Sequence, residues 1–258
     1  MIIDWLEQTE IDVPPENDWL SPNELDRLAT LRIPKRRADW RLGRWTAKRA
    51  VASFLALPGD RPALANIEIR PAPSGAPEVF LHDQPASVAI SLSHSSGVAL
   101  CAVAAPGLSF GCDLEKIESR DDAFIADYFT PEEKSLIARS AIADRPLLLT
   151  LLWSAKESAL KAMHAGLRLP TTSVSAQLGE SWPRPKGKCP HNSMFNSTEE
   201  WLPMGARYSA DQMFTGYWCT KGNLVRTVVS DVPQFTLHQL VETLLATSFG
   251  PRVLAPHP

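Results

Sequence analysis

Three β-rich runs follow one another near the middle of the chain, and long helical stretches stand on both sides of them. Residues 88–93 and 98–104 flank the turn-forming Ser95-Ser96-Gly97, and a third run leads into Asp113. Runs of this composition, bounded by turn residues, predict strands. Two shorter strands are expected at 66–70 and 79–81, around a turn rich in proline and glycine.

Capping residues mark the expected helices. Ser-Pro-Asn-Glu at 21–24 and Thr-Pro-Glu-Glu at 130–133 are capping boxes with proline at the first helical position. Each half of the chain has strands and a substantial helix, which predicts an α+β architecture without a clear sequence repeat. The other expected elements are helices at 34–57, 146–164 (ended by Gly166) and 235–247, strands at 173–178, 216–220 and 223–230, and a loop over 181–205.

The composition excludes several classes of protein. The 258 residues are 44% hydrophobic and 21% charged, with a net charge of −3. These values favour a soluble globular protein with no nucleic-acid or membrane partner. The sequence has no apolar run of about 18 residues, and its start lacks the basic and apolar regions of a signal peptide. We expect a cytoplasmic protein with reduced thiols, because CxxC spacing is absent among Cys101, Cys112, Cys189 and Cys219.

Asp113 and Glu115 form a pair of carboxylates. In a strand, residues i and i+2 project from the same face, so the two side chains lie together. Like charges at this spacing repel unless a cation or proton lies between them, and Mg²⁺ prefers oxygen ligands of this kind. An isolated Asp-x-Glu is more often a solvated strand end. The apolar run 108–112 immediately before the pair favours a buried strand and a metal site.

A second charged run, Trp-Ser-Ala-Lys-Glu-Ser-Ala-Leu-Lys, occupies residues 153–161. On a helix, Glu157 and Lys161 are neighbours on one face, and Lys156 lies beside them. One interpretation is a single ion pair on the surface. The other makes Glu157 a third metal ligand or a general base, with the two lysines neutralising phosphate charge.

Two further features can bind phosphate. Ser93-His94-Ser95 ends an apolar strand, where the histidine is either a structural residue or a donor to a phosphate oxygen. The helix expected from Pro34 carries a stripe of cations, which is either a solvated face or a polyphosphate site, since guanidinium groups bind phosphate in a bidentate manner. The stripe consists of Arg37, Arg41, Arg44 and Lys48.

Three motifs resemble one enzyme family in their order and spacing. They are Ser-His-Ser at 93–95, Gly-x-Asp-x-Glu at 111–115 and Trp-x-x-Lys-Glu-x-x-x-Lys at 153–161. The family is that of the phosphopantetheinyl transferases of the larger, surfactin-synthetase-activating type, and the likeness runs from about Arg36 to Ser175. It implies a pseudodimer of two similar α/β subdomains, here 1–110 and 111–258, with coenzyme A between them.

The implied reaction is that of a holo-[acyl-carrier-protein] synthase. With Mg²⁺, the 4′-phosphopantetheine arm of coenzyme A passes to a serine of an apo acyl, aryl or peptidyl carrier protein, and adenosine 3′,5′-bisphosphate is released. Such carriers serve fatty acid, polyketide and nonribosomal peptide synthesis. We expect the carrier to bind near 117–150, and we expect a monomer because two subdomains can replace a second subunit.

The resemblance also implies residue roles. Glu157 is the expected base, with Glu115 as the alternative, and His94 and Lys161 would contact phosphate oxygens beside Ser93 and Lys156. The expected Mg²⁺ ligands are Asp113, Glu115 and Glu157. The expected contacts to the 3′-phosphate are Arg36 and Arg44, with Arg37 and Arg41 as helpers in binding coenzyme A.

One residue departs from the family pattern. Members often have Gly-Lys-Pro before the Ser-His-Ser strand, whereas this chain has Gly75-Ala76-Pro77, so Arg70 or the cation stripe would have to supply the missing charge. Two other functions compete with transfer. A binder of coenzyme A or of a carrier would not need the intact carboxylates and lysines, and no feature of the sequence calls for a metal-dependent phosphodiester hydrolase.

Overall fold

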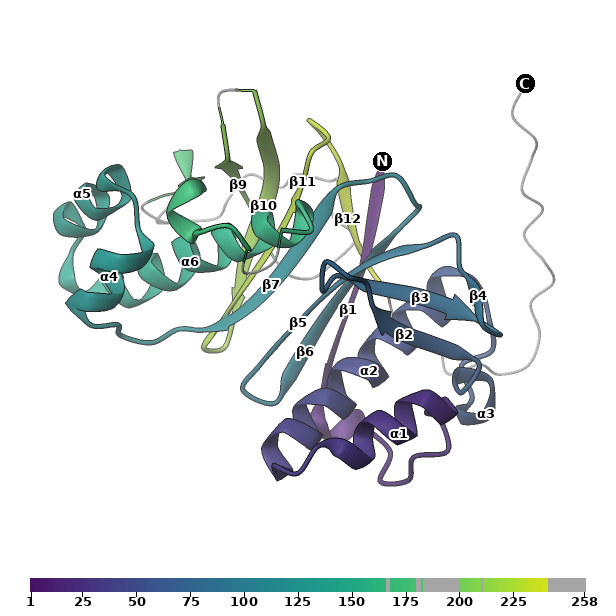
Figure 1. The fold of residues 1–258 in the computed structure, drawn as a ribbon. Coiled ribbons are helices and arrows are strands. Elements are labelled where there is room, and N and C mark those ends of the chain that lie inside the picture. The colour runs from purple at the N-terminus through teal and green to yellow at the C-terminus, as the bar shows by residue number, and fades with distance from the viewer. Residues whose placement is uncertain (166–167, 180–181, 183–199, 210, 241–258) are drawn as a thin grey trace, which may run out of the picture.

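The chain folds into two lobes, each with a sheet and a long helix against it (Figure 1). The computed structural model describes residues 1–165, 168–179, 182, 200–209 and 211–240. The N-lobe contains β1 (Ile2–Thr9), α1 (Pro22–Thr30), α2 (Pro34–Phe54), α3 (Arg61–Leu64), β2 (Ile67–Pro71), β3 (Pro77–Leu81), β4 (Gln84–Pro85), β5 (Ala89–Ser95) and β6 (Val98–Ala104). The C-lobe contains β7 (Phe110–Lys116), α4 (Asp122–Tyr128), α5 (Pro131–Arg139), α6 (Arg145–Ala162), β8 (Ser175–Gln177), β9 (Leu202–Arg207), β10 (Met213–Lys221) and β11 (Leu224–Ser230).

The strands form three sheets. The N-lobe sheet has the order β12-β1-β6-β5, where β12 (Thr236–Gln239) returns from the end of the described chain. The C-lobe sheet has the order β7-β11-β10-β9-β8, and β2, β3 and β4 form a small third sheet. Neighbouring strands are antiparallel except that β12 pairs parallel with β1, from Ile2 opposite Thr236 to Trp5 opposite Gln239.

Strand alternation divides the apolar side chains into three clusters, so that the layers follow the order helix, sheet, sheet, helix. On β6, Cys101 and Val103 face a cluster under α2, whereas Leu100 and Ala102 face a second cluster between the two large sheets. The third cluster lies between the C-lobe sheet and α6. This is the period-2 pattern of strands that are buried on both faces.

The two large sheets meet where β5 and β7 lie side by side. Ser91 Oγ on β5 accepts a hydrogen bond from the backbone N of Cys112 on β7 at 2.9 Å. A second link crosses the interface where the buried Arg226 on β11 pairs with Glu7 on β1. These contacts bring the Ser93-His94-Ser95 segment next to the Asp113 strand.

Most of the expected elements are confirmed. Both capping boxes form, at Ser21 with Glu24 and at Thr130 with Glu133, each with proline in the first turn. The strands expected at the centre of the chain and the hairpin at Lys221-Gly222 are present, and the cysteines within the described residues (Cys101, Cys112 and Cys219) are free thiols. Gly166 and Cys189 lie outside the described residues.

Two expectations about the C-terminal part are wrong. The helix expected at 235–247 is replaced over 236–239 by β12, because Phe235 and Leu237 alternate into the cluster between the sheets while the backbone pairs with β1. Residues 241–247 lie outside the described part. The loop expected over 181–205 includes the start of β9, which pairs with β10 and β8.

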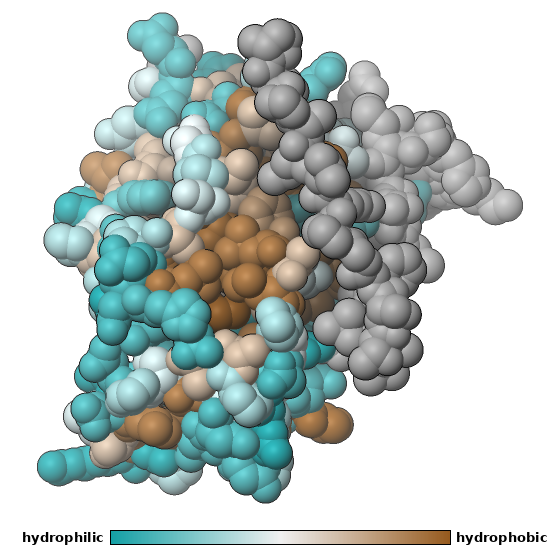
Figure 2. Space-filling model, turned by 90° about the vertical axis from the view of Figure 1, so that its right-hand side faces the viewer, coloured by the Kyte–Doolittle hydropathy of each residue, from teal (hydrophilic) through white to brown (hydrophobic). Residues whose placement is uncertain are grey.

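Apolar side chains also reach the surface. Figure 2 shows the face on the right-hand side of Figure 1, with an apolar area in its middle and mostly hydrophilic residues to its left. Large apolar side chains such as Ile11 and Ile142 are exposed, as is common on folded proteins. Within the described residues, no helix combines the length and hydropathy needed to cross a bilayer.

Candidate functional site

The site begins at a glycine that lets α6 lie directly against β7. A Cβ on Gly111 would stand 2.0 Å from the backbone O of Ser158 and 2.7 Å from the backbone N of Ala162. Glycine is therefore required for the close approach of the two backbones. Since alternate strand residues share a face, the side chains of Asp113 and Glu115 point to the α6 side as well.

Asp113 is the buried centre of the site, with a side chain that is 4% exposed. Its Oδ1 accepts hydrogen bonds from Lys161 Nζ at 2.7 Å and from Ser93 Oγ at 2.8 Å. Burial by itself would lower the pKa of Lys161, but the charge of Asp113 leads a set of contacts that together raise it. Lys161 is thus a permanent cation at neutral pH, and it joins α6 to β7.

Glu115 and Glu157 lie close enough to Asp113 to feel its charge. Trp153 Nε1 on α6 donates to Glu115 Oε1 at 3.1 Å. Burial, and then the negative charge of Asp113, raise the pKa of Glu115 to about 7. Burial followed by Asp113 also raises the pKa of Glu157. We call Asp113, Glu115 and Glu157 the carboxylate cluster.

The carboxylate cluster is suited to a hard divalent cation. Asp113 Oδ2 is buried and has no hydrogen-bond partner among the described residues. Burial first, and then the negative charge of Asp113, raise the pKa values of both glutamates, so a cation bound here would relieve a real cost. As their side chains stand, no group of three or more His, Cys, Asp and Glu residues in the described part meets the geometry of a metal site. The donor chemistry nevertheless fits Mg²⁺, which takes carboxylate oxygens and keeps several waters.

Ser93 and His94 lie on opposite faces of β5. Ser93 points to Asp113, whereas the His94 ring lies near Gly43 of α2, where a glycine Cβ would be 3.9 Å from its Cδ2. Desolvation lowers the pKa of His94, with Asp39 opposing this shift and Lys161 adding to it. The imidazole is therefore neutral at pH 7, and it can donate one hydrogen bond or accept one.

The structure does not bring Lys156 to the carboxylate cluster, contrary to the expectation that it lies near the phosphates. Its side chain is 0% exposed and pairs with Glu133 at 2.6 Å. It also donates to the backbone O of Tyr128 at 2.9 Å. Consecutive helical residues are about 100° apart, so Lys156 points into the lobe while Glu157 faces β7.

Most of the expected cation stripe is used inside the N-lobe. Arg37 donates to the backbone O of Leu28 and of Leu31, and Arg41 donates to the backbone O of Pro14, Pro15 and Glu16. Lys48 is fully buried, and Arg44 lies 3.7 Å from Glu24 and stacks over Trp40. Arg36 is exposed. These contacts tie the segment before α1 and the end of α1 to α2.

The substitute expected for the missing lysine at Ala76 is also engaged. Arg70 pairs with Glu68 at 2.7 Å and with Asp83. The raised pKa of Arg70 reflects first its hydrogen bond to Glu68 and then the one to Asp83.

Three contacts of the site have no clear signal in the sequence. These are the close approach at Gly111, the hydrogen bond from Ser93 to Asp113 and that from Trp153 to Glu115. The serine and the tryptophan stand inside the motifs, but their partners are far away along the chain. The strand and helix periods predict the face on which each residue lies, but they do not predict which element packs against that face.

Comparisons with known proteins agree with this site. Residues 109–189 match the family model described as the 4′-phosphopantetheinyl transferase superfamily. The matched segment includes β7 and α6, and hence the whole carboxylate cluster. The chain is also 30% identical over 152 residues to enterobactin synthase component D of Salmonella typhi. This similarity covers 56% of this chain and 56% of that protein, so the chain matches little more than half the length of that relative.

Proposed function

We propose that this chain, whose residues 109–189 match the 4′-phosphopantetheinyl transferase superfamily, modifies carrier proteins. The proposed reaction moves the 4′-phosphopantetheine arm of coenzyme A to a serine hydroxyl of an apo carrier protein. Adenosine 3′,5′-bisphosphate leaves. The observation that supports it most is the meeting of Asp113, Glu115, Glu157 and Lys161 between β7 and α6.

The residues divide the chemistry among them. Asp113, Glu115 and Glu157 would hold Mg²⁺, which when bound would neutralise charge on the pyrophosphate of coenzyme A. Lys161 supplies a fixed positive charge for a phosphate oxygen. Asp113 orients its ammonium group and is itself held by a hydrogen bond from Ser93. His94, neutral at pH 7, would donate a hydrogen bond to a second phosphate oxygen.

The serine of the carrier must lose its proton as its oxygen attacks the β-phosphorus. The oxygen forms a new bond to that phosphorus, and the bond from phosphorus to the bridging oxygen of the adenosine bisphosphate breaks. Glu157 is the proposed base, and Glu115 is the alternative because its pKa of about 7 is near the working pH. The proton goes to the carboxylate of whichever glutamate acts.

The coenzyme A site would include the start of α2. Arg36 is exposed in its first turn and is the arginine of the expected set that is most open to the 3′-phosphate. Arg37 and Arg44 would have to exchange contacts within the N-lobe to reach it. The proposed carrier surface includes α4 and the segment after α5, where Tyr128 is 39% and Ile142 is 80% exposed.

The two lobes support the pseudodimer proposed for this family type. Each begins with a strand and later has a short helix that begins in a capping box, then a long helix and antiparallel strands, although the C-lobe has the additional helix α4 between β7 and α5. The proposed boundary lies at 110/111, within the first residues of β7. After β11 the chain crosses back and adds β12 to the N-lobe sheet.

Intact mass of an apo carrier protein tests the proposal. The carrier is incubated with this protein, coenzyme A and Mg²⁺, and a parallel sample contains EDTA. We expect a gain of one phosphopantetheine group with Mg²⁺ and none with EDTA. Measurable coenzyme A binding without any mass gain on acyl, aryl and peptidyl carriers would instead favour a binding protein.

A further inference from the structure

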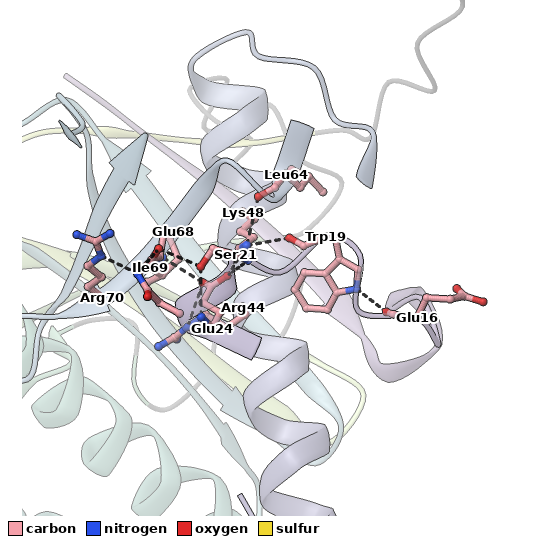
Figure 3. Close-up of polar contacts among 11 residues, drawn as sticks. Glu16, Trp19, Ser21, Glu24, Arg44, Lys48, Leu64, Glu68, Ile69 and Arg70 are labelled. Atoms are coloured by element: carbon pink, nitrogen blue, oxygen red, sulfur yellow. Dashed lines mark hydrogen bonds and ion pairs between the residues drawn. The ribbon is translucent and has the colours of Figure 1, made fainter. Parts of the chain in front are cut away.

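A buried lysine–glutamate pair with the same set of partners occurs once in each lobe. In the N-lobe, the pair is Lys48 on α2 and Glu24 on α1. Glu24 also accepts hydrogen bonds from the backbone N of Ser21 and of Ile69, both at 3.1 Å. Lys48 donates to the backbone O of Trp19 at 2.8 Å, as Figure 3 shows. We call this arrangement the N-lobe clasp.

The C-lobe repeats each of these contacts. Lys156 on α6 pairs with Glu133 on α5 at 2.6 Å. Glu133 accepts hydrogen bonds from the backbone N of Thr130 and of Ala176, both at 2.8 Å. Lys156 donates to the backbone O of Tyr128 at 2.9 Å. This is the C-lobe clasp.

The correspondence extends to the sequence. The lysines end the tetrapeptides Trp-Thr-Ala-Lys at 45–48 and Trp-Ser-Ala-Lys at 153–156. In both lobes the carbonyl that the lysine binds stands two residues before the helix cap, at Trp19 before Ser21 and at Tyr128 before Thr130. Both lysines are 0% exposed, so each clasp holds a desolvated charge that its glutamate compensates, and in the N-lobe Arg44 also lies 3.7 Å from that glutamate.

The two clasps differ in the residue that comes next along the chain. Arg49 stands after Lys48, whereas Glu157 of the carboxylate cluster stands after Lys156. In the C-lobe, a chain of contacts also leads from the clasp to the cluster. Lys156 binds the Tyr128 carbonyl, the Tyr128 ring meets the Trp153 ring with centroids 5.2 Å apart, and Trp153 donates to Glu115.

We propose that Lys156 and Glu133 are positioning residues for the carboxylate cluster. By holding the Tyr128 carbonyl and the start of α5 against α6, they keep the Trp153 indole on Glu115 and Glu157 turned to β7. The N-lobe clasp performs the same packing without such a site. What the cluster does chemically rests on the proposed function, but the positioning itself is testable without any transfer reaction.

The matched variants are Lys156→Met and Lys48→Met, which remove the ion pair and the bond to the carbonyl before the helix cap in each lobe. Lys48→Met also removes a hydrogen bond to the backbone O of Leu64 at 3.2 Å. The readout is the indole N–H resonance of Trp153 in ¹⁵N-tryptophan protein, identified by its loss in Trp153→Phe. We expect Lys156→Met to move this resonance and to speed its hydrogen exchange by about tenfold or more, as for a loosened buried contact. Lys48→Met should leave it at its wild-type position.

A double variant separates positioning from stability. Lys156→Met leaves a buried carboxylate without its partner, whereas Lys156→Met with Glu133→Met removes both charges and should recover much of the lost melting temperature. We expect the Trp153 resonance to stay displaced in the double variant, because the Tyr128 carbonyl remains unbound by Lys156. A resonance at its wild-type position in the double variant would overturn the proposal, whether or not the single variant folds.

Kinetics separate this proposal from the proposed function. With a modifiable carrier, we expect kcat of the double variant to fall on the order of 10²-fold, as for a site misplaced by about 1 Å, with KM for coenzyme A nearly unchanged. If the Trp153 resonance is displaced in the double variant while the wild-type protein modifies no carrier, the positioning proposal is supported and the transferase proposal is refuted. Wild-type kcat together with an undisplaced resonance would refute positioning alone.

Discussion

Replacement of Gly111 by alanine should separate α6 from β7 and so take the site apart. The new Cβ would stand 2.0 Å from the Ser158 backbone O, where ordinary van der Waals contact begins at 3.4 Å. The helix backbone would therefore have to retreat by about 1.4 Å. The two atoms nearest to the new Cβ, Ser158 O and Ala162 N, both belong to the helix backbone, so no rotamer change relieves the clash.

The same retreat sets the size of the effect. Lys161 Nζ stands 2.7 Å from Asp113 Oδ1, and a shift of about 1.4 Å would carry it beyond hydrogen-bond range. Overpacking of this kind costs about 1–3 kcal/mol, and the loss of a buried charged contact adds about 1.5–3 kcal/mol. We expect the free energy of unfolding to fall by about 3–5 kcal/mol and transfer to fall on the order of 10²-fold.

Urea unfolding followed by circular dichroism measures the first quantity, and carrier mass gain under conditions where the variant is folded measures the second. Gly43→Ala is the control on the long helix of the other lobe. Its Cβ would meet the Leu92 Cδ2 at 3.3 Å, a side-chain atom that can yield, so the better helix propensity of alanine should offset the contact. A loss below about 1 kcal/mol with full transfer in Gly111→Ala would refute the argument.

Three other changes test separate parts of the molecule. Glu157→Gln should lower transfer by about 10²-fold or more without loss of folded structure by circular dichroism, and undiminished turnover would remove Glu157 from the mechanism. Leu237→Ala should lower the free energy of unfolding by about 2–5 kcal/mol, since this side chain is 1% exposed between the sheets, whereas Ile11→Ala, at a side chain 94% exposed, should change it by less than about 0.5 kcal/mol. In metal-free protein the raised pKa of Glu115 means that the folded state holds this proton more tightly than the unfolded chain. Stability should therefore fall, by on the order of 2 kcal/mol, as the pH rises from about 4.5 through about 7. Calorimetry should find that Mg²⁺ raises Tm more at pH 8 than at pH 5.5, and an equal rise at both pH values would contradict this account.

The local motifs were predictable because they depend on short-range geometry. The capping boxes at Ser21 and Thr130 need only residues within one helical turn, and both form as expected. The strand period of two was enough to put Asp113 and Glu115 on one face, and the helix period put Glu157 beside Lys161. The family likeness rested on these same residues, and residues 109–189 match the 4′-phosphopantetheinyl transferase superfamily without distinguishing its types.

Other features depended on which surface each element meets. Phe235 and Leu237 were compatible with a helix, and the open edge of β1 made them a strand. The cations of α2 resembled a phosphate site, but nearby carbonyl groups and Glu24 engage Arg37, Arg41 and Lys48. No local pattern distinguishes a charge that faces solvent from one that faces a buried partner.

The chain by itself therefore determined the chemical inventory of the site: three carboxylates and a lysine on one strand and one helix, at spacings set by backbone periodicity. Tertiary structure decided which of these charged residues lie together in the site and which pair with other residues inside a lobe. Packing of α6 onto Gly111 joined Lys161 to Asp113, and packing of α5 onto α6 buried Lys156 with Glu133. The reason is physical: a residue's face follows from local dihedral angles, but its partner follows from which surfaces exclude water together.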